Sequence, residues 1–271
     1  MNYALARPFL ACVDPETAHR LAIRALEMGL AGRTREPNDP ILATNVFGLP
    51  FPNPIGMAAG FDKDAEVPDA ILALGFGFTE AGTVTPRPQP GNPKPRLFRL
   101  TEDEAVINRF GFNSQGVAPF AARLRARREA GRSGIVGANV GKNKTSTDAD
   151  ADYVAGIEAV CAYADYLVCN ISSPNTPGLR GLQERGALED LLGRLAEARA
   201  HLEGAHGKRP LFLKVAPDLD ETAIRDICEL VLQHGIDALI VSNTTIARPQ
   251  HLTSEYAEET GGLSGQPLFA P

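Results

Sequence analysis

Between residues 53 and 242 the sequence alternates short apolar runs with segments of helical pattern, and this alternation limits the fold more than any other feature. Helices are expected at residues 118–130, 152–164, 188–202 and 221–234. The apolar runs between them are nearly continuous, as is typical of parallel strands buried on both faces. They are Ile55–Ala59, Phe76–Glu80, Ile135–Val140, Tyr166–Ile171, Leu211–Val215 and Ala238–Ser242. This spacing predicts a parallel α/β sheet, either open or closed.

The ends of the predicted strands favour the closed form. Five of the six runs end in polar or small residues, and the sixth contains Lys214. Polar groups at successive carboxyl ends converge in a (β/α)8 barrel, whereas in an open sheet they gather at one switch point. The sequence therefore predicts a (β/α)8 TIM barrel of the α/β class, with about six strand–helix units present.

Only six of the eight strands of such a barrel are predicted. A typical barrel of about 250 residues after an arm of about 40 would continue for several dozen residues more. We expect an N-terminal amphipathic helical arm at residues 1–36 and a barrel domain at residues 37–271 that is incomplete at the C-terminus. The last segment, 261–271, reads as the start of another helix. The Pro-rich segment 85–96 is expected to be irregular, or an edge hairpin over one end of the sheet.

The N-terminal arm contains a helix whose start is marked by Asp14 and Pro15. Two interpretations of its apolar face remain open. The helix packs on its own domain, or the face meets a bilayer surface or a hydrophobic ligand. No apolar run near the start approaches the length of a membrane span. The apolar residues are Ala18, Leu21, Ala22, Ala25 and Met28 on one face, preceded by Phe9, Leu10 and Val13.

Composition removes several classes of function. The formal net charge is −6, which argues against a general nucleic-acid binder. No two of the four cysteines form a C-x-x-C pair, and no spacing suggests a metal site. A reduced, cytosolic compartment is the natural expectation. None of the five histidines lies at a strand end, so a Ser-His-Asp arrangement is not indicated.

The segment Asn170-Ile-Ser-Ser-Pro-Asn175 presents amides and hydroxyls at the end of a predicted strand. Alone it reads as an ordinary capped loop. Asn139, Asn243 and Thr244 add neutral donors and acceptors at the same edge, which suits a planar ligand rich in carbonyl and N–H groups. Lys63 and Lys214 either bind an anion or pair with Asp62 and Asp218. Without metal or histidine, such a site must take its chemistry from an organic cofactor.

Several longer motifs resemble the dihydroorotate dehydrogenase family. They are Ala58-Ala-Gly-Phe-Asp-Lys63, the segment 82–99, Ile107-Asn-Arg-Phe-Gly-Phe-Asn113, Asn170-Ile-Ser-Ser-Pro-Asn-Thr176, Val241-Ser-Asn-Thr-Thr245 and Gly261-Gly-Leu-Ser-Gly265. The soluble class of that family has cysteine in the loop where this chain has Ser173. The helix that begins at Asp14 looks like the N-terminal extension of the quinone-dependent class 2 enzymes.

The resemblance implies the oxidation of (S)-dihydroorotate to orotate in pyrimidine biosynthesis, with FMN as cofactor and a membrane quinone as acceptor. Ser173 would be the catalytic base. Substrate positions would be Lys63, Asn108, Arg109, Phe110, Gly111, Phe112, Asn170, Asn175, Asn243 and Thr244. Flavin positions would be Ala59, Gly60, Phe61, Asp62, Lys63, Thr83, Asn139, Asn170, Lys214, Ser242 and Gly265. His19 and Arg99 would lie near the quinone tunnel.

The resemblance also implies a monomer that binds the membrane surface through its N-terminal arm, on the cytoplasmic face of a bacterial cell membrane. In this family the last two barrel strands hold the FMN phosphate, so we expect that part of the site to be missing from these 271 residues. Two alternatives remain: an inactive fragment that binds no flavin, and another FMN-barrel oxidoreductase acting on a pyrimidine.

Overall fold

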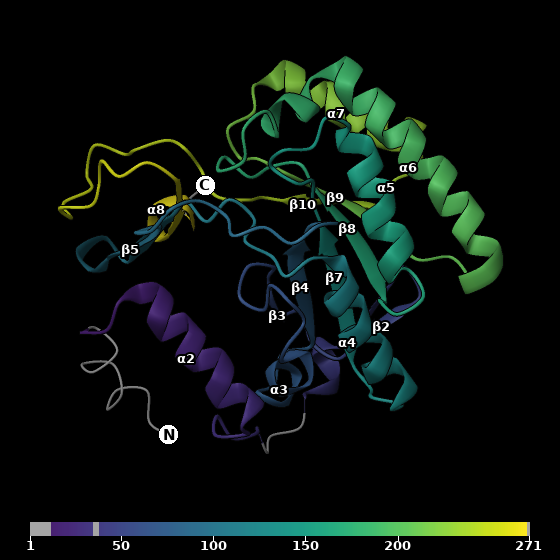
Figure 1. Cartoon of the computed structure of the whole chain (residues 1–271), viewed down its shortest axis with the longest axis horizontal. Coiled ribbons are helices and arrows are strands. Elements are labelled where there is room, and N and C mark those ends of the chain that lie inside the picture. The colour runs from purple at the N-terminus through teal and green to yellow at the C-terminus, as the bar shows by residue number, and fades with distance from the viewer. Residues whose placement is uncertain (1–11, 35–37, 270–271) are drawn as a thin grey trace.

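The computed structural model describes residues 12–34 and 38–269, and its centre is a parallel sheet of six strands (Figure 1). The strands lie in the order β10-β9-β8-β7-β4-β3. Their bounds are β3 Gly56–Met57, β4 Phe78–Val84, β7 Ile135–Val140, β8 Tyr166–Asn170, β9 Leu211–Val215 and β10 Ala238–Val241. All six predicted strands are confirmed. Their order across the sheet follows their order along the chain, as in part of a (β/α)8 barrel.

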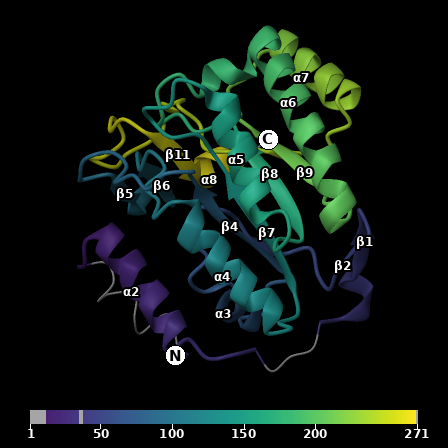
Figure 2. The same ribbon diagram turned by 45° about the vertical axis from the view of Figure 1, so that its right-hand side comes forward.

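Helices α4 to α7 lie along one face of this sheet (Figures 1 and 2) and confirm the four predicted helices. One of them, α5, begins three residues earlier than expected because the side chain of Asp148 accepts a hydrogen bond from the N–H of Ala151 and caps it there. The helices are α3 Pro68–Ala73, α4 Val117–Glu129, α5 Ala149–Val160, α6 Arg185–His206 and α7 Glu221–Gln233, with short 3-10 turns η1 Pro40–Leu42, η2 Thr101–Asp103 and η3 Arg180–Gln183.

A second, antiparallel sheet stands at the carboxyl ends of the parallel strands, with the order β11-β6-β5. Its strands are β5 Leu97–Leu100, β6 Ala105–Asn108 and β11 Gly262–Gly265. The Pro-rich segment before β5 is largely irregular, as predicted. The expectation for residues 261–271 is wrong in part, because a strand comes first and only then α8, Gln266–Phe269.

Strand β11 also connects the two sheets. The N–H of Leu263 donates to the carbonyl of Thr245 at 2.8 Å, just beyond β10. A Cβ added at Gly262 would lie 1.9 Å from the hydroxyl oxygen of Thr244, so only glycine permits this close approach.

A hairpin that the sequence did not reveal, β1 Thr44–Val46 and β2 Leu49–Phe51, lies near the amino-terminal ends of the parallel strands. Between this hairpin and the inner face of the sheet is an apolar hollow of about 410 Å³. Phe51 packs edge-on against Phe78 of β4, and Phe47 lies close to Phe212 of β9. The hairpin therefore covers part of the inner face of the sheet.

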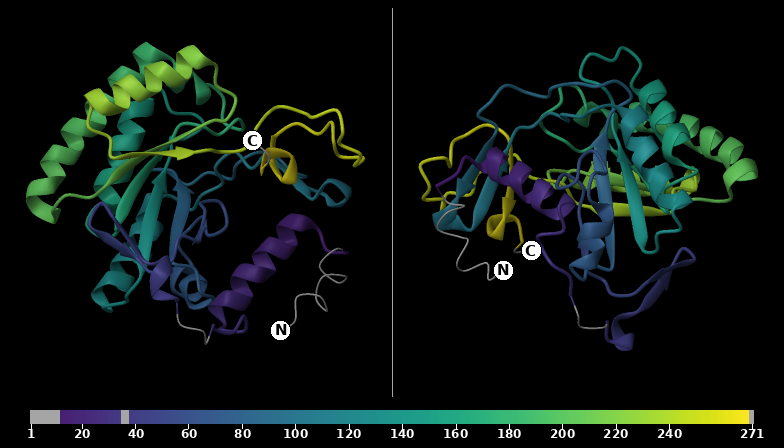
Figure 3. Two further views of the ribbon diagram at one scale, coloured as in Figure 1. Left: turned by 180° about the vertical axis from the view of Figure 1, so that it is seen from behind. Right: turned by 60° about the horizontal axis from the view of Figure 1, so that its bottom comes forward.

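The predicted arm helix is confirmed as α2, Pro15–Glu27, which lies outside the parallel sheet between β5 and α3 (Figure 3). It packs through Ile23 and Leu26. Only part of the predicted apolar face is packed, because Ala18 is buried whereas Leu21 is 48% exposed and Met28 is 72% exposed. Phe9, Leu10 and the expected boundary at residues 36 and 37 lie outside the described residues. No helix in the described ranges is long and apolar enough to span a membrane.

Candidate functional site

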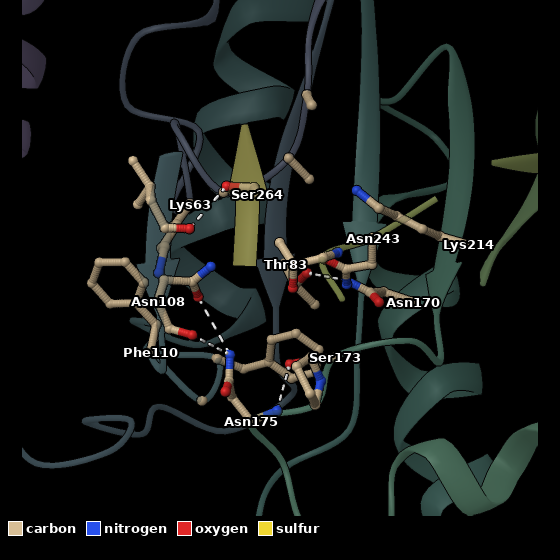
Figure 4. A pocket seen from close by; sticks show the side chains of 18 of the residues that line it. Lys63, Thr83, Asn108, Phe110, Asn170, Ser173, Asn175, Lys214, Asn243 and Ser264 are labelled. Carbon is tan, nitrogen blue, oxygen red and sulfur yellow. Dashed lines mark hydrogen bonds between the residues drawn. The ribbon is translucent and has the colours of Figure 1, made fainter. Parts of the chain in front are cut away.

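A cavity of about 430 Å³ lies between the carboxyl ends of the parallel strands and the antiparallel sheet (Figure 4). The predicted convergence of strand ends is thus confirmed. The cavity is lined by Ala58, Ala59, Gly60, Lys63, Thr83, Leu97, Val106, Asn108, Phe110, Gly111, Phe112, Asn170, Ser173, Pro174, Asn175, Lys214, Ser242, Asn243, Thr244, Ser264 and Leu268.

Beneath the cavity a continuous chain of hydrogen bonds joins the ends of β4, β7, β8 and β10. Thr83 donates its hydroxyl to Asn139 at 2.6 Å and accepts from the Asn170 amide at 2.9 Å. Asn170 accepts from the Ser172 hydroxyl at 2.8 Å, and Ser172 accepts from the Asn243 amide at 3.0 Å. We call these five residues the floor network. Its members are neutral, and most of them are buried.

The direction of every bond in the floor network is fixed at its two ends. Glu80, buried inside the barrel, accepts from the amide of Asn139 at 2.7 Å. At the other end the backbone N–H of Thr244 donates to the side-chain oxygen of Asn243 at 2.8 Å. Burial raises the pKa of Glu80, and the charge of Lys214 opposes that rise. Both ends impose the same order of donors and acceptors on the network.

Ser173 faces the cavity from the loop that follows β8 (Figure 4). Its side-chain oxygen accepts a hydrogen bond from the N–H of Asn175 at 3.3 Å. The side chain of Asn175 donates to the carbonyl of Asn108 at 3.0 Å, which ties this loop to β6. Ser173 is only 6% exposed. The hydroxyl therefore lies at the surface of the cavity with little of the residue exposed to solvent.

Lys63 is the cation nearest the antiparallel wall of the cavity. Its amine lies 3.5 Å from the centre of the Phe110 ring and donates to the side-chain oxygen of Asn113 at 2.6 Å. Burial lowers the pKa of Lys63 to about 7, and the positive charge of Arg96 adds to the effect. Lys63 thus stands close to the boundary between its charged and neutral forms, where a bound carboxylate would favour the charged form.

We call Lys63, Phe110 and the sheet β5-β6-β11 the cover. Arg109, at the outer end of β6, pairs with Glu259 and also donates to Thr260 at 3.1 Å. These contacts tie the segment before β11 to β6. The cover therefore joins segments that are 150 residues apart in sequence.

A second buried cation, Lys214, reaches the cavity from β9 and is 7% exposed. Among the described residues it has no carboxylate within salt-bridge distance. Across the cavity, Gly60 leaves open space where a side chain would project. A free cation, amide and hydroxyl groups, and exposed backbone fit a flat heterocycle with alternating carbonyl and N–H groups.

Most of the predicted site residues line this cavity, and a few lie beside it. Arg109 is outside, Asn139 is buried beneath Thr83, and the Asp62 carboxylate accepts from the N–H groups of Glu66 and Val67. Phe61 and Gly265 are also absent from the lining. Asp62 therefore shapes the loop that presents Lys63, and burial raises its pKa to about 6.

His19 is a residue of α2, and Arg99 of β5 lies beside the start of that helix. His19 binds the carbonyl of Phe61 through Nε2 at 2.7 Å, and burial lowers its pKa. Arg99 donates to the carbonyl of Val13 at 2.9 Å. Neither lines the main cavity.

Sequence reasoning missed several lining residues, which are Ala58, Leu97, Val106, Pro174, Ser264 and Leu268. Leu97, Val106 and Ser264 come from the antiparallel sheet. Burial alternates within β5 and β6, but their sequences, Leu-Phe-Arg-Leu and Ala-Val-Ile-Asn, do not alternate apolar with polar residues, so they gave no signal for these positions.

The fold and the cavity together define a (β/α)-barrel protein that binds a planar, polar ligand at the carboxyl ends of its strands. The family model for dihydroorotate dehydrogenase matches residues 41–270. Two relatives named dihydroorotate dehydrogenase (quinone) are 60% identical over 268 residues, from Azorhizobium caulinodans, and 59% identical over 269 residues, from Rhodospirillum rubrum. These matches cover 98% of this chain and 75% and 71% of the relatives.

Solved structures agree with the sequence matches. DHODH from Eimeria tenella in complex with ferulenol has a TM-score of 0.89 and 44% identity, and covers 94% of this chain and 73% of its own. The ligand-free form from the same organism has a TM-score of 0.90 and 45% identity, with coverage of 94% and 76%. The chain belongs to the dihydroorotate dehydrogenase family, which is a family of flavoproteins.

Proposed function

We propose that this protein oxidises (S)-dihydroorotate to orotate and passes the electrons to a membrane quinone. The observation that carries the proposal is the single cavity in which Ser173, Lys63 and the amides of Asn108, Asn170 and Asn243 meet. The matches to quinone-type relatives support the choice of reaction and acceptor.

In this proposal Ser173 is the base that removes a proton from C5 of dihydroorotate. A serine hydroxyl is a weak base unless its surroundings help, so its low exposure and fixed position matter. Lys63 binds the substrate carboxylate, which is an anion at neutral pH. Substrate amide and carbonyl groups bind the floor and its neighbours, through Asn108, Gly111, Phe112, Asn170, Asn175, Asn243 and Thr244.

FMN is the proposed cofactor, and when bound it accepts the hydride that leaves C6 of the substrate. Lys214, Thr83 and Ser242 would hold its ring by charge and hydrogen bonds. Ala59 and Gly60 would let the ring approach the backbone closely. Asn139, Phe61, Asp62 and Gly265 support these positions from outside the cavity.

We further propose that residues 1–36 form an arm that meets the membrane surface, while residues 37–271 form the flavin domain. In α2 the exposed Leu21 and Met28 are seven residues apart, so they share a face two turns apart. Such a face fits the interface of a bilayer. His19 in this helix and Arg99 beside it lie where a quinone would enter. The protein would act as a monomer on the cytoplasmic face of a bacterial membrane.

The test is the visible absorption spectrum of the 271-residue chain after addition of FMN, followed by dihydroorotate without oxygen. A flavin band that bleaches with dihydroorotate would support the proposal. Bleaching with another dihydropyrimidine but not with dihydroorotate would overturn the substrate. A chain that binds no flavin would show that these residues alone do not carry the activity.

A further inference from the structure

A buried ion pair connects α2 with the segment just before β5. The guanidinium of Arg96 donates to both carboxylate oxygens of Glu16, through Nε at 2.9 Å and Nη2 at 2.8 Å. The two side chains are only 8% and 12% exposed. A bidentate pair of this kind has a defined geometry as well as attraction. The proposed reaction uses neither residue, so their burial needs another explanation.

The remaining donor group of Arg96 binds the turn that precedes β5. Nη1 donates to the carbonyls of Pro90 and Asn92, at 2.7 and 2.8 Å. Asn92 in turn donates its backbone N–H to the carbonyl of Phe110 at 2.8 Å, and its side chain to the carbonyl of Asn175 at 3.0 Å. Through Asn92, the ion pair is therefore connected to Phe110 in the cover and to Asn175 in the loop of Ser173.

The Phe110 ring is close to both Arg96 of the ion pair and Lys63. The guanidinium carbon of Arg96 is 5.3 Å from the centre of the ring, and the amine of Lys63 is 3.5 Å from it. On the same face of α2, three residues after Glu16, His19 binds the carbonyl of Phe61. Helix α2 thus contacts the Lys63 loop directly and the Phe110 ring through Arg96.

We propose that Glu16 and Arg96 are positioning residues of the substrate site, which hold Phe110 in place and set the charge around Lys63, so that α2 is a working part of that site. The assignment of Lys63 to substrate binding rests on the proposed function. The coupling between α2 and Lys63 does not, and it can be measured in the protein without flavin or substrate.

The sign of the coupling follows from the charges. Loss of the Glu16 charge leaves Arg96 uncompensated beside Lys63 and favours the neutral amine, whereas loss of Arg96 favours the charged amine. The charged and titratable groups around Lys63 and this ion pair are Glu16, His19 and Arg20 of α2, Lys94 and Arg96 before β5, and Asp64 and Glu66 of the Lys63 loop.

The experiment measures acetylation of Lys63 by acetic anhydride across a series of pH values, with the Lys63 peptide quantified by mass spectrometry. Only the neutral amine reacts, so the midpoint of the curve reports its protonation. Lys208, which is exposed, serves as the internal reference. Glu16→Gln keeps the size of the side chain and removes its charge. Arg20→Gln is the matched control, because Arg20 ties α2 to Glu66 at 3.0 Å without touching Arg96.

We expect the Lys63 midpoint to fall by roughly 0.5 to 1 pH unit in Glu16→Gln and to rise in Arg96→Gln. In Arg20→Gln it should stay at the wild-type value. Opposite shifts from the two halves of one ion pair distinguish this coupling from general loosening, which would move both midpoints the same way. Equal midpoints in wild type and Glu16→Gln, or a parallel shift in both variants, would overturn the proposal. If Arg96→Gln does not fold, the Lys63 midpoint of Glu16→Gln is compared with that of Arg20→Gln, and a fall in Glu16→Gln alone supports the proposal. The acetylation result does not depend on flavin, so it would remain valid even if the chain bound no flavin.

Discussion

The floor network and the cover enclose the same cavity by different physical means. The floor network is made of neutral side chains at the ends of parallel strands, and each amide and hydroxyl in it has a fixed direction. The cover depends on charge, through Lys63 against Phe110 and Arg109 against Glu259. Buried neutral hydrogen bonds are insensitive to salt and pH, whereas partly exposed charges respond to both. The comparison suggests that the floor sets ligand orientation and the cover sets affinity.

The largest expected effect is at Ser173, where the two regions meet. Ser173→Ala should keep bound flavin but slow its reduction by dihydroorotate near neutral pH by about 10²- to 10⁴-fold, the usual contribution of a positioned base. Anaerobic stopped-flow absorbance measures the rate. Ser146→Ala, in an exposed loop, is the control for effects of losing a serine hydroxyl away from the cavity. A reduction rate like that of wild type would remove Ser173 from the role of base.

The floor network should respond to loss of a single hydroxyl. Thr83→Val removes the donor to Asn139 and the acceptor for Asn170, which leaves one polar atom of each buried amide without its partner. We expect the free energy of unfolding to fall by about 2 kcal/mol. Urea denaturation measures it. Thr83→Ser retains the hydroxyl and should lose clearly less. Equal losses in the two variants would mean that the network contributes nothing beyond packing of the methyl group.

The cover should respond to pH, and the sign follows from Lys63. Its pKa of about 7 means that the amine is charged below pH 7 and neutral above it. Binding of the orotate carboxylate to the flavin-loaded protein should therefore weaken as pH rises above 7, by up to about tenfold per unit. Titration calorimetry from pH 6 to pH 8.5 measures the affinity. In Lys63→Met the dependence should disappear. A flat profile in the wild type would contradict the role of the cation.

The smallest effect is expected at the outer edge of the cover. Arg109→Gln removes a partly exposed ion pair with Glu259, so the free energy of unfolding should fall by less than about 1 kcal/mol. The same urea experiment applies, and the effect should shrink further in high salt. A loss as large as that of Thr83→Val would erase the distinction between floor and cover.

The contrast between the two regions also explains what the sequence could predict. The floor follows from continuous apolar runs that end in polar residues, and all six of those strands are confirmed. The cover was largely missed. Its strands β5, β6 and β11 are four residues long, and the last pairs with a partner about 150 residues away. Short strands carry little periodicity, and no local pattern encodes such a distant partner.

Individual side chains show the same limit. Lys63 and Ser173 were predicted as site residues, whereas no role was predicted for Glu16 or Arg96. Their burial depends on how α2 lies against the rest of the chain. The predicted apolar face of α2 matches the packed face only in part for the same reason, since Ile23 and Leu26 also pack against α3.

The pairing of β11 with β6 has a consequence for the order of folding during synthesis. The floor strands are complete once residue 241 has left the ribosome, and they are joined by local strand–helix units. The third strand of the cover, at residues 262–265, must then find residues 105–108, a contact of long sequence separation that carries a high loop-closure entropy. The floor can therefore form first, and the cavity acquires its second wall only when this late segment joins the hairpin.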